Sequence, residues 1–108
     1  MIRSPRAKGR RVEHLVVKML QDMGLFARRQ PLSGAIRDFP HDVYAKLPDG
    51  DLICEVKARA KPPQVILNWL GKADVLFIKP NNAPFTVHMS EDTWRRLIAM
   101  VRQNDAAR

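Results

Sequence analysis

The stretch DVYAKLPDGDLICEVKARA, residues 42–60, decides how the chain is expected to fold. Two runs of alternating apolar and polar residues flank the turn sequence Pro48-Asp49-Gly50, an arrangement that is typical of a β-hairpin. The simplest turn pairs Leu47 with Gly50. A bulge at the turn would shift the pairing by one position, so the register is a prediction that the structure can test.

Three charged side chains are expected on one face of this hairpin. In the unbulged register Asp42 lies opposite Glu55, and directly opposed residues share a face. Lys57 follows two residues after Glu55, so side-chain alternation directs it to the same face. Two neighbouring carboxylates suit Mg²⁺, which prefers oxygen ligands and leaves positions for water and phosphate. The pattern predicts metal-assisted phosphodiester hydrolysis, with Lys57 beside the attacking water.

Other interpretations of these acids stay open. Glu55 and Lys57 could form only an exposed salt bridge, which contributes little to stability. Asp38 is a rival ligand if the loop before the hairpin folds back. Asp49 and Asp51 flank the turn, where aspartate is favoured for hydrogen bonding to the backbone, and are expected to be structural.

An amphipathic helix is expected over 8–23, because its apolar residues recur at steps of three and four. Gly24 follows as a left-handed stop. Glu13 lies beside the apolar stripe of this helix, on the border between core and solvent.

The remaining segments complete an α/β fold in a single domain over 1–108, with a basic, flexible arm over 1–8. We expect a central mixed sheet of about five strands flanked by helices. Outside the hairpin, the predicted strands are 25–29, a buried strand over 73–79, and 85–89; the predicted loop is 30–41; further helices lie between Pro63 and Gly71 and after a cap at Ser90.

The charge of the chain indicates binding to a polyanion. Its 19 Lys and Arg exceed its 11 Asp and Glu, giving a net charge of +8 and a pI near 10.4. Duplex nucleic acid is the commonest polyanionic partner, because its phosphates release condensed counterions on binding. A merely soluble or ribosome-associated basic protein is the alternative.

A cytoplasmic location is expected. No run of about 18 apolar residues could span a bilayer, and no apolar segment of the secretory type follows the basic N-terminus. The lone cysteine, Cys54, has no partner for an internal disulfide and is predicted to be a buried thiol in a reducing compartment.

Several of these residues resemble a known nuclease signature. Asp42 followed by VYA, with Glu55-Val56-Lys57 ending an apolar strand, resembles the PD-(D/E)XK nuclease superfamily. Glu13 within KGRRVE, and Ser33-Gly34 in the loop, narrow the resemblance to the archaeal-type Holliday junction resolvases and their phage relatives. His41 stands where the signature has proline.

The resemblance implies a restriction-endonuclease-like core in a prokaryotic or phage-encoded homodimer that cuts branched, four-way DNA with Mg²⁺, or with Mn²⁺ in its place. It makes Asp42 and Glu55 metal ligands, Lys57 the catalytic lysine, and Glu13 a further ligand, bound directly or through water. Gln64 and His41 would be supporting residues. The side chains expected to contact DNA, from charge or resemblance, are Arg6, Lys8, Arg10, Arg11, Arg28, Arg29, Ser33, Arg59 and Lys61.

Two other functions stay open. One is a nuclease of the same superfamily that acts on flap, nicked or linear duplex DNA. The other is a non-catalytic nucleic-acid-binding module in which the acids are structural. The cluster VILNWL, which contains Trp69, could belong to the core or to a dimer surface.

Overall fold

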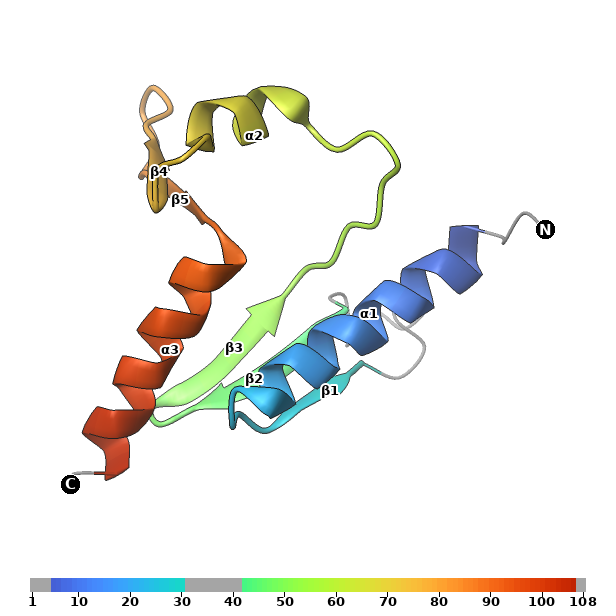
Figure 1. Ribbon diagram of the computed structural model, residues 1–108, viewed down its shortest axis with the longest axis vertical. Coiled ribbons are helices and arrows are strands. Elements are labelled where there is room, and N and C mark those ends of the chain that lie inside the picture. The colour runs from blue at the N-terminus through green and yellow to red at the C-terminus, as the bar shows by residue number, and fades with distance from the viewer. Residues whose placement is uncertain (1–4, 31–41, 107–108) are drawn as a thin grey trace. The chain divides into compact units, whose positions relative to one another are not determined.

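The computed structural model describes residues 5–30 and 42–106, and it divides into two compact units, Met1–Ala60 and Lys61–Arg108 (Figure 1). The first unit contains α1 (Pro5–Asp22), β1 (Ala27–Arg29), β2 (Val43–Leu47) and β3 (Gly50–Cys54). The second contains α2 (Gln64–Leu70), β4 (Val75–Ile78), β5 (Thr86–Met89) and α3 (Glu91–Ala106). The α/β composition is as expected; the single domain over 1–108 stays a prediction.

The predicted hairpin register is confirmed. β1, β2 and β3 form an antiparallel sheet in that order, and Leu47 pairs with Gly50 without a bulge. The same ladder pairs Lys46 with Asp51, and an ion pair of 3.0 Å joins their side chains, Nζ to Oδ1. Opposite charges directly across a strand pair attract, so this contact supports the unshifted register.

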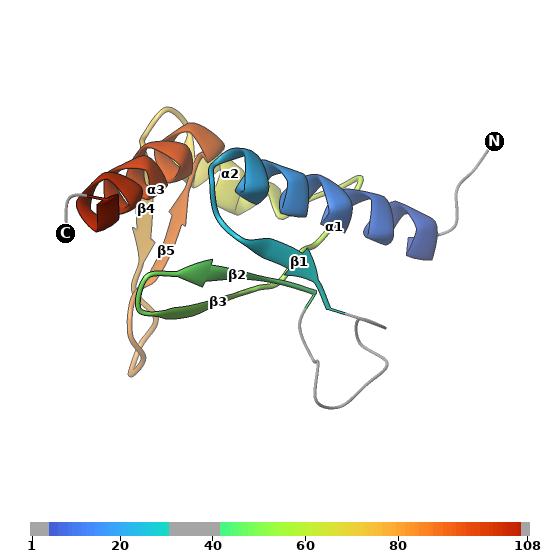
Figure 2. The ribbon, with the colours of Figure 1, turned by 90° about the horizontal axis from the view of Figure 1, so that it is seen from below.

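α1 packs on one face of the three-stranded sheet, where it contacts β1 and β2 (Figure 2). The buried strand residues on this face are small or β-branched and lie two apart, as side-chain alternation requires. With residues of α1 and of the turn after it, they form a core that consists of Leu20, Leu25, Ala27, Val43 and Ala45. The opposite face carries the exposed side chains of Phe26 and Ile53.

The end of α1 is set by Gly24, as predicted. Its φ of 90° is left-handed, and its N–H donates to Gln21 O at 2.8 Å. The N–H of Leu25 reaches back to Leu20 O at 3.0 Å, and both of these leucines are buried. This is a Schellman cap, which satisfies two carbonyls and adds an apolar contact. The helix begins at Pro5, earlier than predicted, because proline is favoured in the first turn.

The helices of the second unit begin and end at predicted signals. Pro63 precedes α2, and Gly71 follows it with a φ of 50°. Ser90 caps α3, since its Oγ accepts a hydrogen bond from Thr93 N at 3.2 Å. Ile98 on α3 is buried. No helix in the described ranges combines the length and apolar character that a membrane span requires.

The predicted central sheet is wrong. The described strands form two separate antiparallel sheets, of three and two strands, because β4 pairs with β5 and not with the hairpin. β5 follows β4 after a short turn, and short loops close at the lowest entropic cost. The predicted burial of residues 73–79 is also wrong: Phe77 is 63% exposed and meets the ring of Phe85 edge-on, at a centroid distance of 6.2 Å.

Substitution of Gly24 tests the cap of α1. Gly24→Ala should lower the free energy of unfolding by about 1–2 kcal/mol, because alanine is strained in the left-handed region. Gly9→Ala is the matched control: Gly9 lies inside α1, a Cβ there meets nothing within 4 Å, and helix propensity predicts a gain of about 0.5–1 kcal/mol. Urea unfolding of both variants measures the difference; equal effects would contradict the cap.

Candidate functional site

Asp42 immediately precedes β2, and its carboxylate is held against the segment that follows β3. Asp42 Oδ2 accepts a hydrogen bond of 2.8 Å from the backbone N–H of Val56. That amide belongs to the peptide unit between Glu55 and Val56, so the Asp42 carboxylate lies beside the main chain of Glu55. The contact joins residues 14 apart in the sequence and gives Asp42 the position opposite Glu55 that the register predicts.

Glu55 and Lys57 lie on the same face, as predicted. β3 ends at Cys54, because β2 begins at Val43, the pairing partner of Cys54. The alternation of exposed and half-buried residues nevertheless continues through this segment to Arg59. Lys57 Nζ lies 3.2 Å from Glu55 Oε1, with the two side chains 64% and 47% exposed. The exposed salt bridge considered as an alternative is therefore present.

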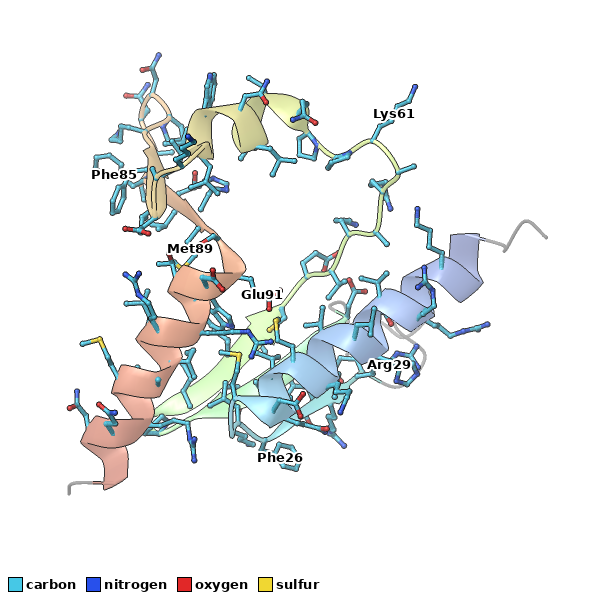
Figure 3. All side chains as sticks on the ribbon, viewed as in Figure 1. Phe26, Arg29, Lys61, Phe85, Met89 and Glu91 are labelled. Atoms are coloured by element: carbon cyan, nitrogen blue, oxygen red, sulfur yellow. The ribbon has the colours of Figure 1, made fainter. Side chains whose placement is uncertain are left out.

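Glu13 is held by Arg29. Glu13 Oε1 accepts a hydrogen bond of 2.8 Å from Arg29 Nε, and this guanidinium projects from β1 toward α1 (Figure 3). Glu13 is only 9% exposed. The sequence predicts a position on the border between core and solvent; Glu13 is instead buried and bonded to Arg29.

Side-chain alternation assigns Glu13's partner and the other two acids to different faces of the sheet. Arg29 pairs with Val43, so its side chain is on the face that α1 covers. Asp42 and Glu55 are each one residue beyond a residue of that face, so alternation assigns them to the opposite one. Within residues 5–30 and 42–106, no three His, Cys, Asp or Glu side chains form a group that could hold a metal ion. The contacts place Asp42 against the Glu55–Val56 peptide and Lys57 against Glu55, whereas Glu13 contacts Arg29.

Gln30, which the sequence did not single out, lies beside Asp42. Its backbone N–H donates to Asp42 O at 2.9 Å, which continues the pairing of β1 with β2 by one residue. Its side chain is buried, and its Oε1 has no hydrogen-bond partner among the described residues. The sequence alone does not place Gln30 beside Asp42, because that position follows only once the register between β1 and β2 is known.

Cys54 lies one residue before Glu55 but is not suited to act as a nucleophile or as a metal ligand. The side chain is half-buried, and its Sγ contacts Leu52 O at 3.8 Å. Burial raises the pKa of the Cys54 thiol above its usual value. The thiol therefore stays protonated at neutral pH, and a protonated thiol is a poor nucleophile and a poor metal ligand.

The side chains expected to contact DNA have different surroundings. Arg28 is stacked on the Tyr44 ring, with its guanidinium carbon 4.7 Å from the ring centroid. Lys61 projects into solvent from the segment between β3 and α2 (Figure 3). Arg59 donates to its neighbour's carbonyl, Ala58 O, at 3.0 Å. On α1, Lys8 is half-buried, whereas Arg10 and Arg11 are exposed.

Gln64, expected to support catalysis, forms its side-chain hydrogen bond within its own helix. Gln64 Nε2 donates to Asn68 Oδ1 at 3.0 Å, one helical turn along α2, so its amide is engaged within that helix. Four of the predicted positions lie outside the part of the chain, or the side chains, that the structure describes: Arg6, Ser33, Asp38 and His41.

A double-mutant cycle tests whether Glu13 and Arg29 act as a structural pair. Glu13→Ala and Arg29→Ala should each lower the free energy of unfolding by about 1–3 kcal/mol, since each leaves a largely buried charge without its partner. The double variant should lose less than the sum. Lys46 and Asp51, an exposed pair, provide the control, with an expected coupling below about 1 kcal/mol. Equal coupling in both cycles would contradict a structural role.

Comparison of the chain with protein-family models, with curated proteins and with solved structures finds no match for any of them. The residues and contacts of this site are therefore the grounds for any assignment of function.

Proposed function

We propose that the chain is a Mg²⁺-dependent DNA endonuclease of the PD-(D/E)XK type. The observation that carries the proposal is the hydrogen bond from Val56 N–H to Asp42 Oδ2. It holds the Asp42 carboxylate against the peptide unit between Glu55 and Val56, and the ammonium of Lys57 forms an exposed ion pair with Glu55. Two acids and a lysine in this arrangement suit hydrolysis of a phosphodiester.

The donor set fits a hard divalent cation. Asp42 and Glu55 offer carboxylate oxygens, and Mg²⁺ is commonly bound by one or two carboxylates while it retains waters. A bound Mg²⁺ would polarise a phosphoryl oxygen and lower the pKa of a coordinated water. Glu13 supports the site indirectly, through its ion pair with Arg29. This pair holds β1 against α1, next to β2, the strand that Asp42 precedes.

Lys57 is the residue best placed to act on the phosphate. Its ammonium is exposed, and its contact in the free protein is an ion pair with Glu55. Exposed ion pairs are weak, so a phosphate oxygen can replace the carboxylate as the partner of Nζ. In that position the ammonium offsets the negative charge that develops on the phosphate and orients the attacking water.

DNA is the polyanion that this chain is proposed to bind. The net charge is +8, and Arg10 and Arg11 are exposed on α1 upstream of the site. Such side chains contact phosphates and give affinity without sequence selectivity. The preference for a four-way junction, and a homodimer that cuts it symmetrically, rest on the resemblance carried by Glu13 and Ser33-Gly34.

A second candidate function is favoured by the ion pairs. Glu13 is bound to Arg29 and Glu55 to Lys57, so both acids have a structural role without any metal. A non-catalytic nucleic-acid-binding module would use the same basic side chains. Its binding would weaken with salt and would not respond to a chelator.

Substitutions on the hairpin separate the two functions. Asp42→Asn and Lys57→Met should each lower the rate of Mg²⁺-dependent junction cleavage by about 10²–10⁴-fold, because they remove a ligand and a charged group near the water. Asp51→Asn and Lys46→Met are matched controls, since these residues form an exposed ion pair on the same hairpin. The controls should cleave normally, and all four variants should still bind DNA.

The substrate is identified in the same assay by comparing a four-way junction, a flap and a linear duplex under one condition. Faster cleavage of the junction supports a resolvase; faster cleavage of the flap or duplex supports another nuclease of the superfamily. If the Asp42→Asn and Lys57→Met variants cut at the wild-type rate, the assignment of Asp42 and Lys57 to the catalytic site is wrong. If the wild-type chain binds DNA but cuts none with Mg²⁺ or Mn²⁺, the binding module is the better assignment.

A further inference from the structure

Gln30 has a buried oxygen that lacks a partner. Its side chain is 8% exposed. No donor in the described parts of the chain, 5–30 and 42–106, reaches its Oε1. Burying an amide oxygen without a hydrogen bond destabilises the folded state. A donor or a cation supplied from outside these residues would remove that destabilisation.

Alternation along the backbone assigns the Gln30 side chain to the face expected for Asp42 and Glu55. The hydrogen bond from Gln30 N–H to Asp42 O extends the β1–β2 ladder by one position. Arg28, two residues earlier, is stacked on Tyr44, whereas Arg29 turns to the α1 face and binds Glu13. Alternation therefore assigns Gln30 to the face of Arg28 and Tyr44.

Three oxygen-bearing side chains thus form one row across three neighbouring segments. Gln30 is opposite Asp42, and Asp42 is opposite Glu55 at the next position beyond the β2–β3 ladder. Opposed side chains on one face have Cβ atoms about 4.5–5.5 Å apart, which is within the span that one cation can bridge. Asp42 is fixed in the middle of the row by Val56 N–H.

We propose that Gln30 Oε1 is the third protein oxygen around the divalent cation held by Asp42 and Glu55, an inference that rests on the proposed function. Carboxylate and amide oxygens together are a donor set that suits Mg²⁺, Mn²⁺ and Ca²⁺. A neutral oxygen adds a ligand without adding repulsion between carboxylates. The cation in turn gives the buried oxygen its partner. Gln30 would thus be the additional metal ligand, the role that the resemblance assigns to Glu13. The Glu13 carboxylate is instead bound by Arg29.

Mn²⁺ binding to the full chain without DNA, measured by calorimetry, tests this inference apart from cleavage. Gln30→Met keeps the length of the side chain and removes the oxygen, and it should weaken Mn²⁺ binding about 10-fold or more. Gln30→Glu restores an oxygen and should bind Mn²⁺ at least as tightly as the wild type. In metal-free urea unfolding Gln30→Met should be as stable as the wild type or more so, because an unpartnered polar atom is gone.

A merely structural glutamine predicts the reverse: lower stability with unchanged Mn²⁺ affinity. Gln21→Met is the matched control, since Gln21 Nε2 donates to Ala27 O at 3.1 Å and Gln21 has no part in the proposed cation site; it should lose stability and keep Mn²⁺ affinity. If Gln30→Met binds Mn²⁺ within twofold of the wild type while Asp42→Asn does not bind, the role of Gln30 is overturned and the nuclease site stands. If the wild type binds no Mn²⁺, both are overturned.

Discussion

The hydrogen bond between Val56 N–H and the Asp42 carboxylate is the contact on which the proposed site depends. The ladder between β2 and β3 ends at the pair Val43 and Cys54, one position before the residues that carry the chemistry. A charge-assisted hydrogen bond contributes about 1.5–3 kcal/mol, enough to hold the two segments together beyond that end. Because a slip of one residue would turn Glu55 to the other face, the unbulged turn and this bond together determine which side chains meet.

The two faces of the small sheet divide the acids by role. On the covered face, Glu13 and Arg29 form a largely buried ion pair that links α1 to β1. On the open face, Glu55 and Lys57 form an exposed pair that an incoming phosphate can replace at little cost. Glu13 on α1, which resembles a nuclease metal ligand, thus has a structural role in this chain. In our proposal the unpartnered Oε1 of Gln30, directly after β1, is the metal ligand in its place.

Features set by sequence neighbours were predictable, and those set by distant partners were not. The turn at Pro48-Asp49, the Gly24 cap and the Ser90 cap follow from local backbone chemistry, and all three were predicted correctly. The partner of Glu13 depends on the register of β1 against β2, which the intervening residues 31–41 leave undetermined in the sequence. The apolar run of β4 is equally compatible with a central strand and with the two-stranded pairing to β5 that is observed, because periodicity alone does not name a partner.

The central claim is that Asp42, Glu55 and Gln30 surround one divalent cation on the face of the hairpin away from α1. Paramagnetic broadening of backbone amide signals by substoichiometric Mn²⁺, in the DNA-free chain, tests it most directly. The account predicts that the amides of Gln30, Glu55 and Val56 broaden first, while that of Lys46, about 13 Å along the strand from Asp42, broadens last. Broadening centred on the turn at Asp49 and Asp51, or no broadening at all, would contradict it.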